Sequence, residues 1–227
     1  MTSVKTGQDK KQTSVLLVDD HPIVRQGIKM LVAREADMVV SGEAESAAEA
    51  LGVIEKTHPD VAVVDLSLKE SSGLELIKDI RIRYPKLLVL VLSMRDESFY
   101  AERVLRAGAR GYITKEEGTE KVIEGIRRII AGDIYLSDKL ASKMIGKLVG
   151  GGTTAGAPLT QALTDRELEV FELIGSGLTT REIAEKLHLS PKTIESHREH
   201  IKEKLNIDTA AELLKHAIHW VQCQGTP

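Results

Sequence analysis

Five short apolar runs, separated by longer segments with helical spacing, dominate the first half of this 227-residue chain. The runs are rich in valine, leucine and isoleucine, and they occupy residues 15–18, 38–40, 61–64, 87–92 and 111–113. Strands buried on both faces of a parallel sheet have this composition, because helices cover both faces. The alternation therefore predicts a doubly wound α/β domain with a five-stranded parallel sheet over residues 14–131.

The second half of the chain lacks a strand pattern and carries several helix-start signals instead. Thr164 and Thr179 each stand three residues before a glutamate, which is the pattern of a capping box. Ser190, with a proline at the next position, marks a third helix start, and a fourth is expected near Asp208. These signals predict a second, smaller all-α domain over residues 160–227.

The remaining segments are polar or rich in small residues. Residues 1–13 are polar and lysine-bearing, and we interpret them as a disordered tail. Residues 132–159 are expected to form a short helix capped by Ser137 and then a glycine- and threonine-rich linker. No apolar run approaches the roughly 20 residues that span a bilayer, so we expect a cytoplasmic protein without membrane contact. The single cysteine, Cys223, excludes an internal disulfide, as expected in a reducing compartment.

Polar side chains follow four of the five predicted strands. Asp19 and Asp20 end the first strand, Asp65 and Ser93 end the third and fourth, and Lys115 follows the fifth. Because ligands bind at the carboxyl ends of parallel strands, we expect these side chains to converge. Neighbouring carboxylates repel unless a cation is bound, and oxygen ligands suit Mg²⁺. Aspartate can also accept a phosphoryl group covalently. Lys115 and the metal would then neutralise its charge, and the Ser93 hydroxyl could donate a hydrogen bond to a phosphoryl oxygen.

The motifs at these positions resemble the receiver domain of two-component response regulators. They are Leu-Leu-Val-Asp-Asp-His-Pro at 16–22, Val-Ala-Val-Val-Asp-Leu at 61–66, Ser93, and Gly-Ala-Arg-Gly-Tyr-Ile-Thr-Lys at 108–115. The resemblance covers residues 14–131 and implies a flavodoxin-like receiver in which Asp65 accepts a phosphoryl group from a sensor histidine kinase. It also implies that Asp20, Asp65 and the carbonyl group of Ser67 bind Mg²⁺ directly, with Asp19 assisting through water.

A switch pair is also implied by the resemblance. On phosphorylation the hydroxyl of Ser93 is expected to move inward, with the aromatic ring of Tyr112 following it. Tyr112 can equally be a core aromatic residue whose hydroxyl lies near solvent.

The chain departs from the family pattern just after the acceptor. Leu68 and Lys69 stand where the family usually has a Met-Pro pair, although the family's Gly73 is present. Loss of the proline frees the loop beside the phosphorylation site. We therefore expect an altered phosphoryl lifetime rather than a loss of phosphorylation.

The C-terminal residues resemble the LuxR-type DNA-binding domain of NarL/FixJ-class regulators. The matching residues are Leu-Thr-Asp-Arg-Glu at 163–167, Gly177, Glu-Ile-Ala at 182–184, Leu187, Leu-Ser-Pro-Lys-Thr-Ile at 189–194, His197 and Lys-Leu at 204–205. The turn at 188–190 is short enough for a helix-turn-helix, whose following helix reads the major groove of double-stranded DNA.

Helical geometry predicts which side chains of that recognition helix face the DNA bases, which lie near phosphates and which border the core. The candidate DNA-contacting residues are Lys192, Thr193, Glu195, Ser196, His197, Arg198, Glu199 and Lys202. Those at 192, 195, 196 and 199 lie opposite the apolar stripe and should face the major groove. Arg198 and Lys202 lie on its flank, where phosphate contacts are expected. His197 borders the core.

The charge of the C-terminal domain opposes strong DNA binding. Residues 160–227 contain eight lysines and arginines against eleven aspartates and glutamates. Phosphate contacts supply much of DNA affinity, so we expect weak binding by this domain alone. A glutamate can accept a hydrogen bond from a cytosine amino group, which predicts a preference for C·G pairs opposite Glu195 or Glu199.

Together these features predict a phosphorylation-controlled transcription regulator that is not an enzyme. Phosphorylation is expected to favour a homodimer that binds paired DNA half-sites. The fourth helix, which carries Ala211, Leu214 and Ile218, resembles the dimer contact of the family, and its apolar face can equally be ordinary core. One alternative is a protein-interaction switch whose C-terminal domain binds DNA weakly or not at all. A second is a small phosphatase with an aspartate nucleophile, which the helix-turn-helix disfavours.

Overall fold

The computed structural model describes residues 12–68, 71–95, 97–118, 120–149 and 162–224. The chain divides into two compact units, Met1–Leu140 and Ala141–Pro227. Most of the predicted tail, Lys69 and the glycine-rich run 150–158 lie outside the described residues. The domain boundaries drawn from the sequence stay predictions.

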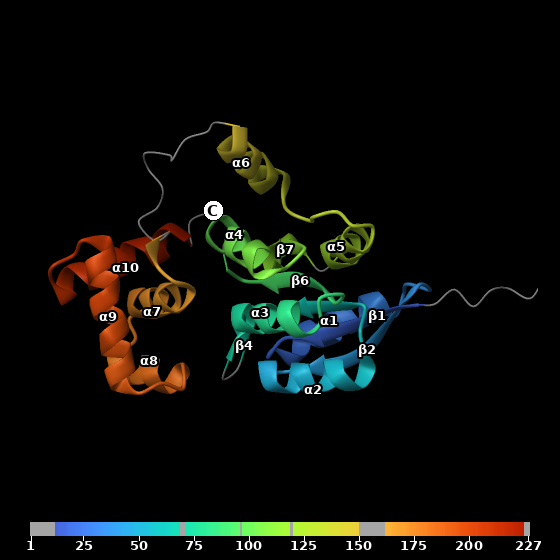
Figure 1. Ribbon diagram of the computed structural model, residues 1–227, viewed down its shortest axis with the longest axis horizontal. Helices are drawn as coiled ribbons and strands as arrows, with labels where there is room; N and C mark the ends of the chain where they lie inside the picture. Colours follow the sequence, from blue (N-terminus) through green and yellow to red (C-terminus); the bar gives the residue numbers. More distant parts are fainter. Residues whose placement is uncertain (1–11, 69–70, 96, 119, 150–161, 225–227) are drawn as a thin grey trace, which may run out of the picture. The chain divides into compact units, whose positions relative to one another are not determined.

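The first unit contains a five-stranded parallel sheet in the order β2-β1-β3-β6-β7 (Figure 1). Its strands are β1 (Thr13–Val18), β2 (Met38–Ala44), β3 (Val61–Val64), β6 (Leu88–Ser93) and β7 (Gly111–Thr114). The helices that connect or follow them are α1 (Pro22–Val32), α2 (Ala47–Thr57), α3 (Gly73–Arg83), α4 (Glu97–Ala107) and α5 (Glu120–Ile130). This topology confirms the doubly wound α/β fold.

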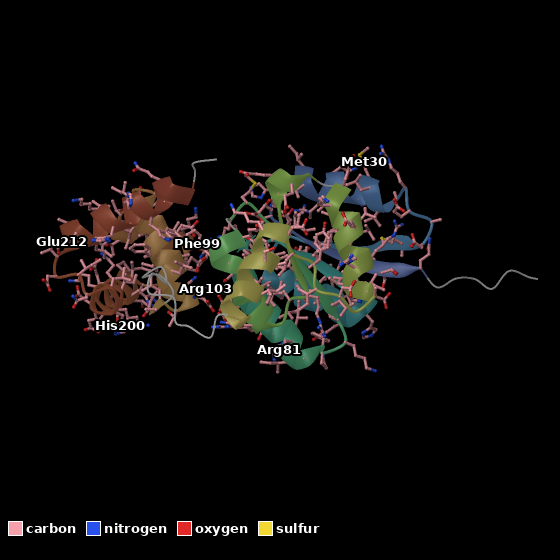
Figure 2. The ribbon with its side chains drawn as sticks, turned by 90° about the horizontal axis from the view of Figure 1, so that it is seen from above. Met30, Arg81, Phe99, Arg103, His200 and Glu212 are labelled. Atoms are coloured by element: carbon pink, nitrogen blue, oxygen red, sulfur yellow. The ribbon has the colours of Figure 1, made fainter. Side chains whose placement is uncertain are left out.

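The core of this unit lies on both faces of the sheet. Val15 and Leu17 of β1 pack with Ile28 of α1 and with apolar residues of α5. Leu16 is also fully buried and lies on the opposite face, which α2 covers. Met30 lies on the side of α1 that faces away from its buried residues and is exposed (Figure 2). Each fully buried leucine or isoleucine stabilises the fold by roughly 1.5–3 kcal/mol relative to an exposed one.

A small antiparallel hairpin follows the third strand and was not predicted from the sequence. It consists of β4 (Ser67–Leu68) and β5 (Ser71–Ser72). Gly73 begins α3 directly after it, at a point where the helix approaches the strand closely. A Cβ atom on Gly73 would lie 2.1 Å from the carbonyl oxygen of Asp65 and 2.7 Å from the Cα atom of Leu66. Only glycine fits there without a shift of the backbone.

The C-terminal unit is helical within its described residues. Its helices are α7 (Asp165–Gly175), α8 (Thr180–Lys186), α9 (Pro191–Leu205) and α10 (Ala210–Gln224). Both predicted capping boxes are present, at Thr164 and at Thr179, and the Ser190 hydroxyl accepts a hydrogen bond from the backbone N–H of Thr193. Another helix, α6 (Asp138–Val149), spans the division between the units, and the hydroxyl of Ser137 accepts from the N–H of its Leu140, as predicted.

The buried face of α10 differs from the stripe that the sequence suggested. Leu213 and Ala217 are fully buried against α7, whereas Leu214 is 41% exposed. Ala211 is exposed and Ile218 is only half-buried. Two adjacent leucines make both faces of the helix apolar, so periodicity could not select the one that packs. The predicted stripe is therefore an outward apolar face of this unit.

None of the described helices is long and apolar enough to cross a membrane.

Candidate functional site

Three side chains from different parts of the chain meet at the carboxyl end of the sheet. The Nζ atom of Lys115 lies 2.6 Å from Asp19 Oδ2 and 2.7 Å from Asp65 Oδ2. Both aspartates are only 3% exposed. β1 ends just before Asp19, β3 ends just before Asp65, and Lys115 follows β7, so the parallel register of the sheet creates this convergence.

The electrostatics of this cluster depend on the lysine. Burial raises the pKa of Asp65, the hydrogen bond and charge of Lys115 lower it, and the neighbouring charge of Asp19 raises it again. The net result is a pKa above the ordinary value. Burial alone would lower the pKa of Lys115, but its hydrogen bonds to the two carboxylates outweigh burial and raise it. Lys115 therefore stays protonated between them at neutral pH.

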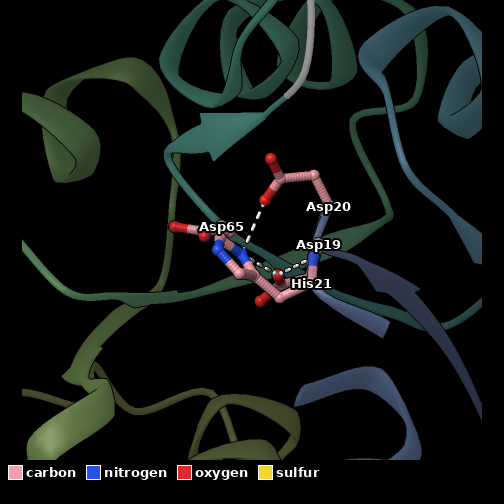
Figure 3. Close-up of side chains that lie close together, drawn as sticks. All are labelled: Asp19, Asp20, His21 and Asp65. Atoms are coloured by element: carbon pink, nitrogen blue, oxygen red, sulfur yellow. Dashed lines mark hydrogen bonds and ion pairs between the residues drawn. The ribbon is translucent and has the colours of Figure 1, made fainter. Parts of the chain in front are cut away.

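The acidic cluster offers ligands for a divalent cation. Ligand atoms of Asp19, Asp20, His21 and Asp65 all lie within 4.8 Å of one another (Figure 3). Asp20 Oδ1 is buried without a hydrogen-bond partner among the described residues. His21 Nδ1 lies 2.7 Å from it, but as a charge contact without hydrogen-bond geometry. A hard cation with oxygen ligands fits this donor set.

Ser93 and Tyr112 lie beside the cluster and contact the same residue. The Tyr112 hydroxyl donates to the carbonyl oxygen of Arg95 at 2.7 Å, and the Ser93 hydroxyl accepts from the Arg95 N–H at 3.3 Å. Tyr112 is 1% exposed, and burial raises its pKa far above the ordinary value. The aromatic ring thus occupies an inward position, and its hydroxyl is bonded to the protein rather than to solvent.

The recognition helix of the second unit has the two faces expected from its sequence. Ile194, Ile201 and Leu205 are buried. The side chains at 192, 195, 196 and 199 are exposed, as is His200 further along α9 (Figure 2). The preceding turn places His188 in the left-handed backbone region at φ 52°, and α8 and α9 pack together across it. This is a helix-turn-helix arrangement.

Comparisons with known proteins agree with both halves. Residues 15–127 match the response regulator receiver domain, and residues 161–217 match the bacterial regulatory proteins of the luxR family. Oxygen regulatory protein NreC of Staphylococcus carnosus is 36% identical over 208 residues, which are 90% of this chain and 96% of NreC. NreC of Staphylococcus aureus strain JH9 has the same identity and coverage. This chain belongs to the NarL/FixJ class of response regulators.

Solved structures of other response regulators are similar over most of the chain. RcsB of Salmonella enterica serovar Typhimurium, bound to promoter P1flhDC in the presence of the phosphomimetic BeF3⁻, is 28% identical with a TM-score of 0.65. The match covers 91% of this chain and 98% of RcsB. A LuxR-family response regulator from Aurantimonas sp. SI85-9A1 is 34% identical with a TM-score of 0.57, covering 61% of this chain and 99% of its own.

Sequence reasoning missed an arginine in the receiver of this response regulator. Arg95 Nε donates to the Ser67 hydroxyl at 3.2 Å, and its Nη1 donates to the hydroxyl of Tyr100. Its guanidinium also lies 4.8 Å from the centre of the Tyr100 ring. Ser67 in turn donates its backbone N–H to Asp65 Oδ1 at 3.2 Å. Arg95 therefore connects the loop after Asp65 to α4, a contact that sequence spacing does not reveal.

Ion pairs modify the predicted DNA-reading face of this response regulator. Lys202 Nζ lies 2.8 Å from Glu199, and Arg198 Nε lies 3.9 Å from Glu195. Glu195 also accepts a hydrogen bond from the Thr180 hydroxyl of α8 at 2.7 Å. The two cations expected to contact phosphates are thus turned toward the glutamates and largely covered. Half-buried His197 has a lowered pKa, first from burial and then from the charge of a nearby arginine.

Proposed function

We propose that this chain is a phosphorylation-controlled, DNA-binding transcription regulator rather than an enzyme. The observation that carries the proposal is the protonated Lys115, held between two buried carboxylates at the carboxyl end of a parallel sheet. A phosphoryl acceptor needs a positioned carboxylate and a fixed positive charge beside it. The same chain carries a helix-turn-helix with an exposed reading face.

In the proposed reaction, Asp65 accepts the phosphoryl group of a phosphohistidine on a sensor kinase. A carboxylate oxygen attacks phosphorus, the phosphorus–oxygen bond forms, and the phosphorus–nitrogen bond breaks as the histidine side chain leaves. Lys115 neutralises charge on the transferred group, and the Ser93 hydroxyl donates a hydrogen bond to a phosphoryl oxygen. Lys115 contacts Asp65 directly, and Ser93 ends β6, the strand beside β3. Both positions suit these roles.

Mg²⁺ is the proposed cofactor of this acidic site. Asp20, Asp65 and the carbonyl of Ser67 would hold the ion, with Asp19 contacting it through water. The ion supplies positive charge that offsets the phosphoryl oxygens. Asp20 Oδ1, which is buried without a hydrogen-bond partner among the described residues, supports this assignment.

Dimerisation and DNA binding are the proposed output. Solved structures of the similar RcsB contain promoter DNA with a phosphomimetic, and dimers on DNA. In this chain, the outward apolar face of α10 is available within its own unit for a two-fold contact. The negative charge added at Asp65 would change which receiver conformation is favoured, and thereby the dimer population.

The proposed output is tested by selecting DNA from a random duplex pool, with and without acetyl phosphate. We expect phosphorylation to raise the retained DNA about tenfold, within the usual range of coupling between two sites. Sedimentation under the same conditions should show a dimer. A phosphorylated protein that retains no DNA would favour the alternative of a protein-interaction switch.

Base reading by Glu195 gives a second test on the selected site. Glu195→Ala should lose about 1–3 kcal/mol of discrimination between a C·G pair and its substitutes at one position. Glu185→Ala on α8 removes the same charge, is exposed, and lies off the recognition helix, so it serves as the control. Both variants should bind all sequences somewhat more tightly, but only the first should change the base preference. Unchanged discrimination by Glu195→Ala would contradict this role.

A further inference from the structure

A buried arginine of α1 holds the backbone between two residues of the acidic cluster. Arg25 is 9% exposed, and its Nη1 donates to the carbonyl oxygen of Asp19 at 2.5 Å. That carbonyl belongs to the peptide group that joins Asp19 to Asp20. Rotation of this peptide would turn the two carboxylates relative to each other, and the contact with Arg25 resists such rotation.

The arginine is itself anchored to the end of β2. Its Nη2 donates to Glu45 Oε1 at 2.7 Å, and its Nε lies 3.4 Å from Glu43 Oε2. The N–H of Asp19 donates to the carbonyl of Ala44 at 3.1 Å. The loop carrying the carboxylates is therefore held on both sides to residues 43–45, at the end of β2 and just beyond it: the Asp19 N–H bonds there directly, and the Asp19 carbonyl is linked there through Arg25.

Charge and geometry give this arginine opposite effects on cation binding. A positive charge near an acidic cluster opposes the entry of a divalent cation, so its removal should strengthen binding if charge dominates. If the peptide contact dominates, removal should weaken binding, because the carboxylates lose their mutual orientation. The sign of the change therefore identifies the role.

We propose that Arg25 is a positioning residue that sets the relative orientation of Asp19 and Asp20 for Mg²⁺. The inference rests on the proposed function in assuming that Mg²⁺ is the ion. Arg25 donates hydrogen bonds in separate directions, to the Asp19 carbonyl through Nη1 and to Glu45 through Nη2, which a lysine ammonium at that position cannot reproduce.

The experiment measures Mg²⁺ binding to the unphosphorylated full-length protein by calorimetry. We expect Arg25→Gln and Arg25→Lys each to raise the dissociation constant about tenfold or more, as outer partners of metal ligands typically do. Lys29→Gln is the matched control, because Lys29 lies one turn further along α1 and contacts Glu43 at 2.6 Å but not Asp19. It should change the dissociation constant less than twofold. Circular dichroism verifies folding, and Arg25→Lys keeps the buried charge if the glutamine variant does not fold.

Phosphorylation by acetyl phosphate at varied Mg²⁺ gives a second readout. The Mg²⁺ concentration at half-maximal rate should rise in the Arg25 variants, while the rate at saturating Mg²⁺ stays within about threefold of wild type. Equal or tighter Mg²⁺ binding by the Arg25 variants, or equal weakening by Lys29→Gln, would overturn the proposal. If wild type binds Mg²⁺ with the expected dependence on Arg25 but takes up no phosphoryl group, the proposed function fails and the positioning role stands.

Discussion

An Asp65→Asn variant is expected to gain no mass on incubation with acetyl phosphate and Mg²⁺, whereas wild type gains a single phosphoryl group. Asparagine preserves the shape of the side chain but lacks the carboxylate oxygen that attacks phosphorus. Intact mass spectrometry shows whether the mass of one phosphoryl group has been added to the protein. A remaining adduct in the variant would place the acceptor elsewhere, and no adduct in wild type would mean that the receiver does not use phosphate.

The same substitution is expected to stabilise the fold at neutral pH. The pKa of Asp65 is raised in the folded protein, mainly by burial, so the ionised carboxylate at pH 7 costs free energy of folding. That cost is present above the raised folded pKa and disappears as pH falls toward the ordinary value of 3.8. Lys115 keeps its partner Asp19 in the variant, so no buried cation is left alone.

Thermal unfolding at two pH values measures this effect. Asp65→Asn should melt at a higher temperature than wild type at pH 7.5, and the difference should shrink toward pH 4.5. A lower melting temperature at pH 7.5 would mean that the bond from Lys115 to Asp65 stabilises the fold by more than burial of the carboxylate costs.

A Gly73→Ala variant is expected to lose about 2–3 kcal/mol of stability, at the upper end of the range for overpacking. The added Cβ would lie 2.1 Å from a backbone carbonyl oxygen, which cannot rotate away as a side chain could. Because that carbonyl belongs to Asp65, relief of the clash would displace the proposed phosphoryl acceptor. A displacement of about 1 Å can slow a positioned reaction about a hundredfold, which acetyl phosphate kinetics would detect.

Gly52→Ala is the control for this prediction. Gly52 lies within α2, and a Cβ atom there would meet nothing within 4 Å among the described residues. Removal of glycine from an open helix position should stabilise the protein by roughly 0.5–1 kcal/mol. Chemical unfolding should therefore move the two alanine variants in opposite directions. A Gly73→Ala variant as stable as wild type would contradict the close approach of α3 to the acceptor strand.

The parallel sheet and the helix starts could be predicted because their signals are local. Apolar runs, capping boxes and the Ser190 cap each lie within a few residues of the element that they define. The convergence of Asp19, Asp65 and Lys115 also followed, since it depends only on strand direction. The pairing of Ser67–Leu68 with Ser71–Ser72 did not, because two-residue strands carry no detectable periodicity.

The contacts of long side chains were beyond sequence reasoning. Arg25 and Arg95 bond to residues far away along the chain, and only the folded backbone brings these partners within reach. Arg198 and Lys202 have helical positions that permit phosphate contacts, but their rotamers direct them to neighbouring glutamates. Periodicity gives the direction of a Cβ atom and not the path of the four or more bonds beyond it.

The hydroxyls of Ser93 and Tyr112 both bond to the backbone of Arg95. Ser93 accepts from the N–H of Arg95, and Tyr112 donates to its carbonyl oxygen. A displacement of the Arg95 backbone would therefore alter both hydrogen bonds at once. The positions of the two hydroxyls are therefore coupled through the main chain of Arg95, in addition to the hydrogen bond between the Ser93 and Tyr112 side chains.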